Sequence, residues 1–451
     1  MGRKKTRNNR SKSAQNSDES DSERSEGSSY ISMQSWDLDQ SEANQVPPLA
    51  GASSSGGGRN SNFQRKNAAT SDVEFGEILD GLSEKRASTR EEKLEELIDY
   101  MVKTQTPENI YPLRDEAVGA LINCLSKSSS EVVSACSALS AFCVLIGPDE
   151  EAIFQRIRQK LERIVTRSMD EEARTAALHA LTIGCFICSS VDHDTMELLD
   201  LLVDLLQGTS QGEIIDEEMI PAALEGWGLL ATTASEVHMK EVAAPSLVPI
   251  CMEHLDSPSV AVRLAAGEVL ALIYEATHPK EPEPDPDDWR NQRFEEEEEE
   301  PEEEDPMMVE LWEEVVGVLG RLKAESSKRM SKRDRKEQRS VFRDIHASIV
   351  DGETPEETIS FPGGSVTVTS WAKFVQVNAL RRACHGGFQN QLQTNPVVQQ
   401  ILAEDYAEGF SNVDRKMYYD KSSSLRKERT QDRRQQRQSR QAAKTQFLDE
   451  F

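Results

Sequence analysis

The sequence lacks the motifs through which most enzymes bind phosphates or activate a nucleophile. It contains no GxGxxG, GxxxxGK[ST], GxSxG or HExxH pattern and no kinase catalytic-loop signature. No set of residues is spaced to combine a nucleophile, a base and an oxyanion hole. We therefore predict a protein that is not an enzyme, takes no small-molecule substrate and uses no cofactor.

Long apolar runs are also missing. No run approaches the ~18 residues that suggest a membrane-spanning helix, so we expect no membrane partner. Hydrophobic residues make up only 37% of the 451 residues, which predicts that part of the chain is disordered. The seven cysteines are scattered and odd in number, which favours a reducing compartment. The expected location is the cytoplasm, the nucleus or both.

A metal site is the main alternative to a structural role for the cysteines. Cys185 and Cys188 form a CxxC pair, and His179 and His193 lie nearby in the sequence. However, the pair belongs to the apolar run LTIGCFIC, and no second CxxC exists. A free cysteine in such a run behaves as a small hydrophobe. We therefore expect these cysteines to pack in the core and predict no metal site.

The net charge of −28 is sorted into blocks. The segment 280–305 holds 15 acidic and 3 basic residues, whereas 321–343 holds 10 basic and 3 acidic residues. The segment 421–444 holds 9 basic and 2 acidic residues. Such blocks are typical of solvated interaction segments, and the basic ones could bind a polyanion. The acidic block could be a tolerated solvated loop, a mimic of a nucleic-acid backbone, or a cover for a basic groove.

Between residues 74 and 325, apolar residues recur at helical spacing and no alternating strand is evident. Four segments share an acidic or serine start followed by alanine-rich apolar spacing: SEVVSACSAL from 130, DEEARTAAL from 170, DEEMIPAAL from 216 and SPSVAVRLAA from 257. Their period of roughly 40–46 residues is that of armadillo and HEAT repeats. We predict an all-α, armadillo/HEAT-like solenoid, with Ala177 and Ala266 at buried helix crossings. An irregular helical bundle is the alternative.

The C-terminal third has a different pattern. Residues 357–371 resemble a β-hairpin, because Val366 and Val368 alternate with threonines after a Pro-Gly-Gly turn. A helix is expected from Ala372 to Cys384, ended by a glycine cap at 386–387. The predicted domains are a disordered arm (1–73), the repeat region (74–350) with a disordered acidic insertion (280–305), a hairpin and helix (351–394), and a basic C-terminal domain (395–451).

Two sets of cations are candidates for nucleic-acid contact. We predict an ordered helix over 330–345, held to the fold by Val341 and Phe342, so that its cations form a fixed basic surface. The C-terminal set lacks such apolar anchors and should order only on binding; a nuclear localisation signal or a solvated tail are its alternatives. The first set is Lys332, Arg333, Lys336 and Arg339; the second is Arg426, Lys427, Arg429, Arg433, Arg434, Arg437 and Arg440.

The string KRDRKEQRSVFRD (332–344), followed by ETISF (357–361), closely resembles the interferon-related developmental regulator family. The strings VRLAAGEVLAL (262–272) and LQTN (392–395) are similar to the same family, and the resemblance covers roughly 75–451. The long glutamate run and residues 403–420 depart from it.

The resemblance implies an armadillo-like N-terminal region, a basic C-terminal domain and no enzymatic activity. Members have been described as ribosome-bound repressors of translation that occupy the tRNA and mRNA paths of idle ribosomes. The implied partners are therefore the ribosome and its rRNA, together with proteins in the solenoid groove. Members have also been described as transcriptional co-regulators. The alternative is therefore a nuclear co-regulator that scaffolds chromatin-modifying proteins in that groove.

Overall fold

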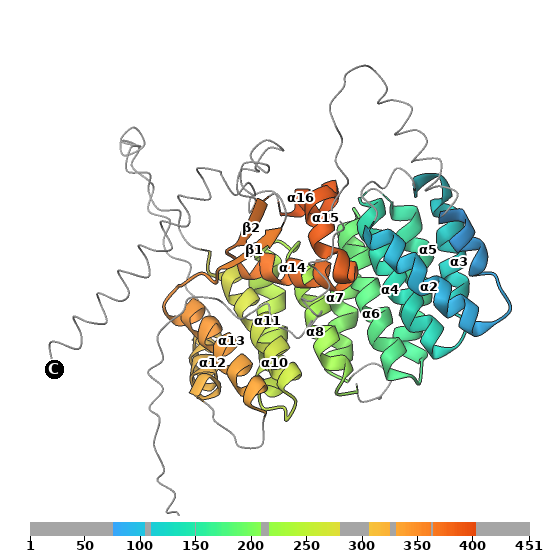
Figure 1. Cartoon of the computed structure of the whole chain (residues 1–451). Coiled ribbons are helices and arrows are strands. Elements are labelled where there is room, and N and C mark those ends of the chain that lie inside the picture. Colours follow the sequence, from blue (N-terminus) through green and yellow to red (C-terminus); the bar gives the residue numbers. More distant parts are fainter. Residues whose placement is uncertain are drawn as a thin grey trace, which may run out of the picture.

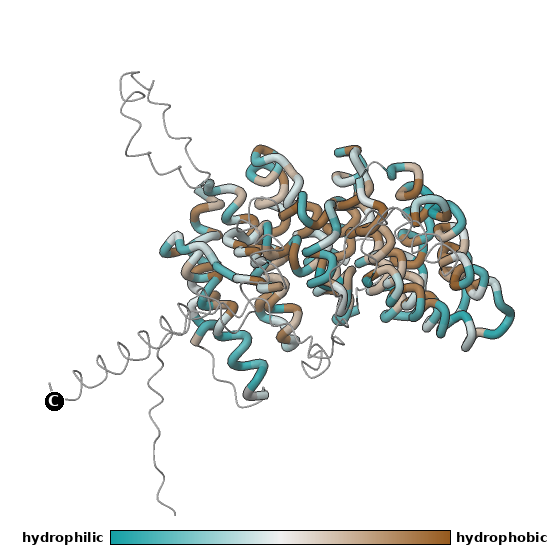
Figure 2. The backbone as a smooth tube through the Cα atoms, turned by 45° about the horizontal axis from the view of Figure 1, so that its top comes forward, coloured by the Kyte–Doolittle hydropathy of each residue, from teal (hydrophilic) through white to brown (hydrophobic). Residues whose placement is uncertain are grey.

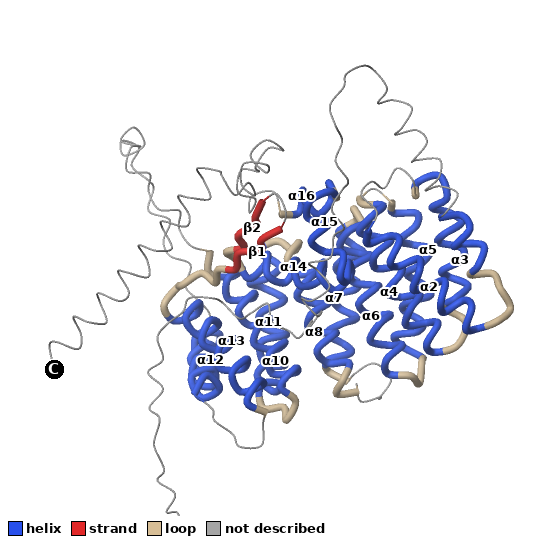
Figure 3. The backbone as a smooth tube through the Cα atoms, in the orientation of Figure 1, coloured by secondary structure: helices blue, strands red, loops and turns tan. Residues whose placement is uncertain are grey.

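A computed structural model describes residues 75–103, 110–148, 150–208, 216–279, 306–324, 331–361 and 364–402. Within these ranges the chain is almost entirely helical, and its one sheet is a two-stranded hairpin (Figure 1; Figure 3). The predicted all-α repeat architecture is confirmed. The predicted arm, the acidic insertion from 280 to 305 and the basic C-terminal tail fall outside the described residues.

The helices of the repeat region form two layers. Neighbouring helices of the inner layer pack against one another in chain order, and each outer helix packs against the inner helix that follows it. The inner layer comprises α2 (Ala87–Lys103), α4 (Ser129–Ile146), α6 (Glu171–Cys188), α8 (Met219–Ala231), α11 (Val260–Thr277) and α13 (Lys332–Val350). The outer layer comprises α3 (Arg114–Cys124), α5 (Glu151–Arg167), α7 (Asp192–Leu206), α10 (Ala244–Leu255) and α12 (Pro306–Ala324). Shorter helical segments connect some of them: η2 (Tyr111–Leu113), α9 (Glu236–His238) and η3 (Met239–Ala243).

The alanine-rich segments of the sequence repeat form the inner helices α4, α6, α8 and α11. Small side chains let these helices approach closely, and Ala177 and Ala266 are fully buried, as predicted. Figure 2 shows hydrophobic positions along the middle of the array and hydrophilic ones mostly towards its periphery. The core is therefore continuous from repeat to repeat, as expected when each repeat buries its apolar face against its neighbours.

A buried arginine in the first turn of every second inner helix ties neighbouring repeats together. Each arginine donates to a backbone carbonyl that precedes its helix and to a side chain that belongs to the next inner helix or precedes it closely. Because each guanidinium is buried, these partners compensate the loss of its hydration. The side-chain pairs are Arg90–Glu131 (2.7 Å), Arg174–Asp216 (2.8 Å) and Arg263–Gln338 (2.6 Å).

The helix predicted over 330–345 is α13, which begins one residue after its N-cap, Ser331, and runs to Val350. Val341 and Phe342 are buried, as predicted, and α13 packs against α11 and α12. The ring of Phe342 lies against Gly267 of α11, where an added Cβ would come within 2.7 Å of its Cε1 atom. The glycine therefore sets how closely these two helices can approach.

After α13 the chain forms the hairpin of β1 (Glu357–Phe361) and β2 (Gly364–Val368), with Ile359 opposite Val366. It continues as α14 (Trp371–Cys384), η5 (His385–Gly387), α15 (Phe388–Thr394) and α16 (Pro396–Ile401). We call residues 371–402 the covering segment. Its helices contact α11, α8, α6, α4 and α2, all of the inner layer, so the segment runs back along the repeats.

The end of α14 corrects the predicted glycine cap. The residue after the helix that adopts a positive φ is His385 (φ 46°), not a glycine. Gly387 has a different role, because an added Cβ would lie 2.5 Å from the carbonyl oxygen of Val102 in α2. The glycine allows the covering segment to touch the backbone of the first described repeat.

The helix α4 is long and apolar enough to meet the length and hydropathy criteria for a membrane span. The sequence does not show this as a continuous apolar run, because five serines and a glutamate interrupt its apolar residues. In the structure, 72% of that window is buried among other helices. One such helix is weak evidence for a membrane span, and burial in a helical core explains its composition.

Candidate binding surfaces

The inner layer contacts the outer helices with one face. The opposite face, which we call its free face, is covered by the covering segment of the same chain. The covering segment begins above α11, where the carboxylate of Glu275 accepts hydrogen bonds from the backbone N–H groups of Trp371 (2.8 Å) and Ala372 (3.1 Å). A carboxylate at this position satisfies unpaired donors of α14 and complements the helix dipole. The start of α14 is therefore fixed to the end of α11.

The rest of α14 is attached through a hydrogen bond near its middle and an ion pair in its last turn. The guanidinium of Arg382 pairs with Glu225 of α8 and lies 3.3 Å from Nδ1 of His179 on α6. Gln376 donates to the hydroxyl of Thr232 at 3.0 Å. These contacts join α14 to two inner helices that lie more than a hundred residues earlier in the sequence.

Two small hollows flank this ion pair, and their electrostatics follow from burial. Glu268 of α11 lines one hollow with Asn378, and His179 lines the other. The pKa of Glu268 is raised to about 8, mainly by burial and to a smaller extent by nearby Glu225, while Arg382 opposes the shift. Burial, with a smaller effect of Arg382, lowers the pKa of His179 well below its usual value. The interface thus favours the uncharged form of both groups.

The end of the covering segment is attached through amide side chains that bond to backbone carbonyls at the ends of inner helices. Gln391 donates to the carbonyl oxygen of Val102 at 2.9 Å, and Asn395 donates to that of Val144 at 3.1 Å. These are the unpaired acceptors that every helix leaves in its last turn. The segment therefore completes the inner helices as well as covering them.

Two of the four cations predicted to form a basic surface on α13 have exposed side chains. Arg333 and Lys336 are exposed, whereas Arg339 is half-buried. Lys332 is the first residue of the helix, and its side chain is outside what the structure describes. Arg343 is exposed and lies about one helical turn after Arg339, so it extends the basic surface towards the middle of α13. The seven cations predicted in the tail, from Arg426 to Arg440, lie outside the described residues.

The cysteines and histidines considered for a metal site have separate surroundings. Cys188 donates towards the carbonyl oxygen of Cys143, and Cys185 contacts Thr195. His193 is exposed and pairs with Glu197, while His179 faces Arg382. In the described ranges no three of the His, Cys, Asp or Glu side chains gather as metal ligands would. The predicted core position of the cysteines is confirmed, since all seven are buried.

Sequence reasoning found α14 as a helix but did not foresee where it packs. The available signal was its composition: Trp371, Phe374, Val375, Val377, Leu380 and Ala383 point in all directions around the helix. A helix that is apolar all round must be buried on several sides. The polar residues Gln376 and Arg382 then had to find partners in the layer beneath it, and only the tertiary structure shows which.

Comparison with known proteins finds similar sequences and similar solved structures. The chain is 27% identical to mouse interferon-related developmental regulator 2 over 338 residues, which covers 72% of this chain and 71% of that protein. It is 24% identical to human interferon-related developmental regulator 1 over 346 residues, covering 72% and 69%. Among solved structures, a designed armadillo repeat protein in complex with the peptide (KR)4 matches with a TM-score of 0.37 and 15% identity, over 60% of this chain and 99% of that one.

The family model for interferon-related developmental regulator matches residues 42–350. The match starts earlier than the resemblance seen in the sequence and ends at the last residue of α13, before the hairpin and the covering segment. Because it spans more than half of the sequence, this chain belongs to the interferon-related developmental regulator family.

Proposed function

We propose that this protein is a non-enzymatic regulatory binding protein that associates with the ribosome through rRNA and represses translation on idle ribosomes. The observation that carries the proposal is the basic surface of α13. Arg333, Lys336 and Arg343 are exposed on a helix whose opposite side is buried through Val341, Phe342 and Ile345. Cations held on a packed helix lose little freedom on meeting phosphates, so they favour a fixed binding mode.

The covered inner face supports this choice over groove binding. In the alternative, a nuclear co-regulator would scaffold chromatin-modifying proteins in the solenoid groove. The covering segment fills the free face of the inner layer from α11 to α2, so a partner there would have to displace it. A partner that binds α13 or the outer layer needs no such rearrangement. Family membership by itself supports a regulatory protein and is compatible with both functions.

The test is sucrose-gradient fractionation of tagged full-length protein. We expect the protein to migrate with non-translating 80S particles and to be released as salt rises, because phosphate contacts release counterions. Replacing Arg333→Glu and Lys336→Glu should weaken the association. Lys85→Glu with Arg86→Glu is the matched control, because these two exposed cations precede α2 and carry the same charge change.

Two results would contradict the proposal. The first is a wild-type protein that is found only in the nucleus and free of ribosomes, which favours the co-regulator. The second is an equal loss of association in the α13 variant and in the control, which would assign the effect to net charge alone.

A further inference from the structure

The outer helix α5 carries a row of cations that sequence analysis did not single out. Arg156, Lys160, Arg163 and Arg167 are all exposed and are spaced by four, three and four residues. This spacing places them on one face of the helix, in a row about 16 Å long at 1.5 Å per residue. We call these four residues the α5 stripe.

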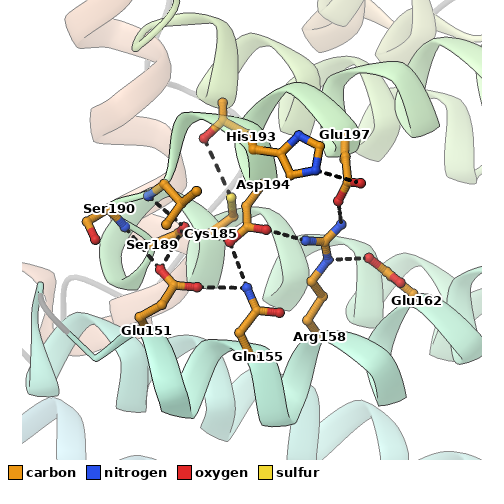
Figure 4. A network of polar contacts seen from close by, with 12 residues as sticks. Glu151, Gln155, Arg158, Glu162, Cys185, Ser189, Ser190, His193, Asp194 and Glu197 are labelled. Atoms are coloured by element: carbon orange, nitrogen blue, oxygen red, sulfur yellow. Dashed lines mark hydrogen bonds and ion pairs between the residues drawn. The ribbon is translucent and has the colours of Figure 1, made fainter.

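The carboxylates near the stripe are committed to other partners. Glu162, Asp194 and Glu197 converge on Arg158, with distances of 2.5, 2.6 and 2.8 Å (Figure 4). Glu151 accepts hydrogen bonds from Gln155 and from Ser189 and Ser190 beyond the end of α6. This network joins α5 to α7, and each of these four carboxylates already has partners within it.

Most of the stripe is therefore left without a counter-charge. Arg156 pairs with Asp115 of α3 at 2.7 Å, and both side chains are substantially exposed. For Lys160, Arg163 and Arg167, no ion pair or hydrogen bond forms with any residue in the described part of the chain. Three unpaired cations in a row on a packed helix attract an extended anion.

The next outer helix has the opposite sign. The helix α7 has five acidic residues and no lysine or arginine, so it keeps an excess of negative charge although Asp194 and Glu197 pair with Arg158. A polyanion would therefore be attracted to α5 and repelled from α7, which restricts the direction from which it can approach. A uniformly basic surface would impose no such restriction.

The chemistry of the stripe favours a phosphate backbone over an acidic peptide. Besides the four cations, the exposed side chains of α5 are Ala152, Gln155 and Gln159. This face thus has no aromatic residue on which an unpaired base could stack and no large apolar residue to anchor a peptide. Arginine forks bind phosphate oxygens in pairs, and a glutamine amide can donate to the sugar–phosphate backbone.

We propose that the α5 stripe is a binding surface for the phosphate backbone of double-helical RNA, separate from the basic surface of α13. The choice of RNA as the phosphate-containing ligand rests on the proposed function. Figure 1 places α5 and α13 towards opposite ends of the repeat array. Two phosphate-binding surfaces at that separation contact different RNA segments, and simultaneous binding raises the overall affinity without further contacts.

The experiment measures binding of full-length protein to a short synthetic RNA duplex across a salt series. In the test variant, Lys160, Arg163 and Arg167 are each replaced by glutamate. Each phosphate contact contributes about −0.9 to the slope of log K against log salt concentration. Loss of three contacts should therefore make this slope shallower by about 2 to 3. The affinity near 0.1 M salt should fall about 10- to 100-fold. The melting temperature should not change, since these side chains have no described partner.

The matched control is Lys85→Glu with Arg86→Glu and Lys103→Glu, three exposed cations of the first repeat. It should leave the slope close to that of the wild type. An unchanged slope in the α5 variant overturns the inference, and so does an equal loss in the control. If the α5 variant loses binding to poly-glutamate while duplex binding is unchanged, the surface serves an acidic protein instead, which also overturns the inference.

The duplex measurement needs no ribosome, so the two proposals can fail separately. A wild-type protein that binds duplex through α5 but never migrates with ribosomes contradicts only the proposed function. A protein that migrates with ribosomes while its α5 variant binds duplex normally contradicts only the inference. A wild-type protein that binds neither contradicts both.

Discussion

On the free face of the inner layer, charged side chains are buried and matched to partners from the covering segment; on the outer layer, they project into solvent in rows of one sign. Arg382 pairs with Glu225 below α14, whereas Lys160 and Arg163 of α5 have no such partner in the described residues. Charge on the first face therefore contributes to folding. Charge on the second costs little to display and is available to another molecule.

The largest expected effect tests how strongly α13 is held to the inner layer. Replacing Phe342→Ala removes a ring that is fully buried against α11. The lost packing and the remaining cavity should lower the free energy of unfolding by about 3–5 kcal/mol, measured by chemical denaturation. A stability loss below about 1 kcal/mol would show that α13 is not packed as described and that its basic surface is not fixed.

A second, pH-dependent effect tests the buried interface below α14. Glu268 stays protonated in the folded protein up to a pKa of about 8, against an ordinary value of 4.5. The stability that this raised pKa contributes is complete below pH 4.5 and is lost as pH rises through 8. At about 1.4 kcal/mol per pKa unit, the loss is at most about 4–5 kcal/mol.

The variant that isolates this effect is Glu268→Gln, which stays neutral at every pH. Urea denaturation at a series of pH values should show wild-type stability falling relative to the variant between pH 4.5 and 8. The groups facing Glu268 are Glu225, Arg382 and Glu337, so their variants are the controls for indirect effects. Parallel stability curves for wild type and Glu268→Gln would mean that the carboxylate is ionised in the folded state.

A smaller effect is expected where two inner helices cross. Ala266 is fully buried, and Ala266→Leu should overpack that crossing and lower the free energy of unfolding by about 1–3 kcal/mol. Thermal melting in comparison with Ala152→Leu, at an exposed position of α5, separates overpacking from a general effect of leucine. If both variants melt alike, the inner layer is less tightly packed than its burial indicates.

The smallest effect on stability is expected on the displayed surface of α13. The double variant Arg333→Glu and Lys336→Glu should change the free energy of unfolding by only about 0–1 kcal/mol, because ion pairs of exposed side chains contribute little. Its melting temperature should therefore stay close to that of the wild type. Ribosome binding should nevertheless weaken. If the variant unfolds while its remaining folded fraction binds ribosomes normally, this cluster is structural, and the comparison between the two faces fails for α13.

Local patterns allowed much of the architecture to be predicted. The helical period, the small residues of the inner helices and the β-alternation of the hairpin each depend on neighbours within one element, and the structure confirms all three. The helix predicted over 330–345, observed at 332–350, and the burial of Phe342 followed from an apolar pair inside a basic run. The predicted glycine cap of α14 was wrong. A sequence shows that a glycine is present, but not whether its position requires a positive φ or only a residue without a side chain.

The sequence by itself determined that the chain is a helical repeat protein with its charge separated into blocks, because periodicity and composition are local properties. Only the tertiary structure decided that the free face of the inner layer is covered by residues 371–402 and that Lys160, Arg163 and Arg167 of α5 form no ion pair within the described ranges. Both depend on which side chains meet across more than a hundred residues of chain or between neighbouring helices. The spacing of residues along one helix does not contain that information.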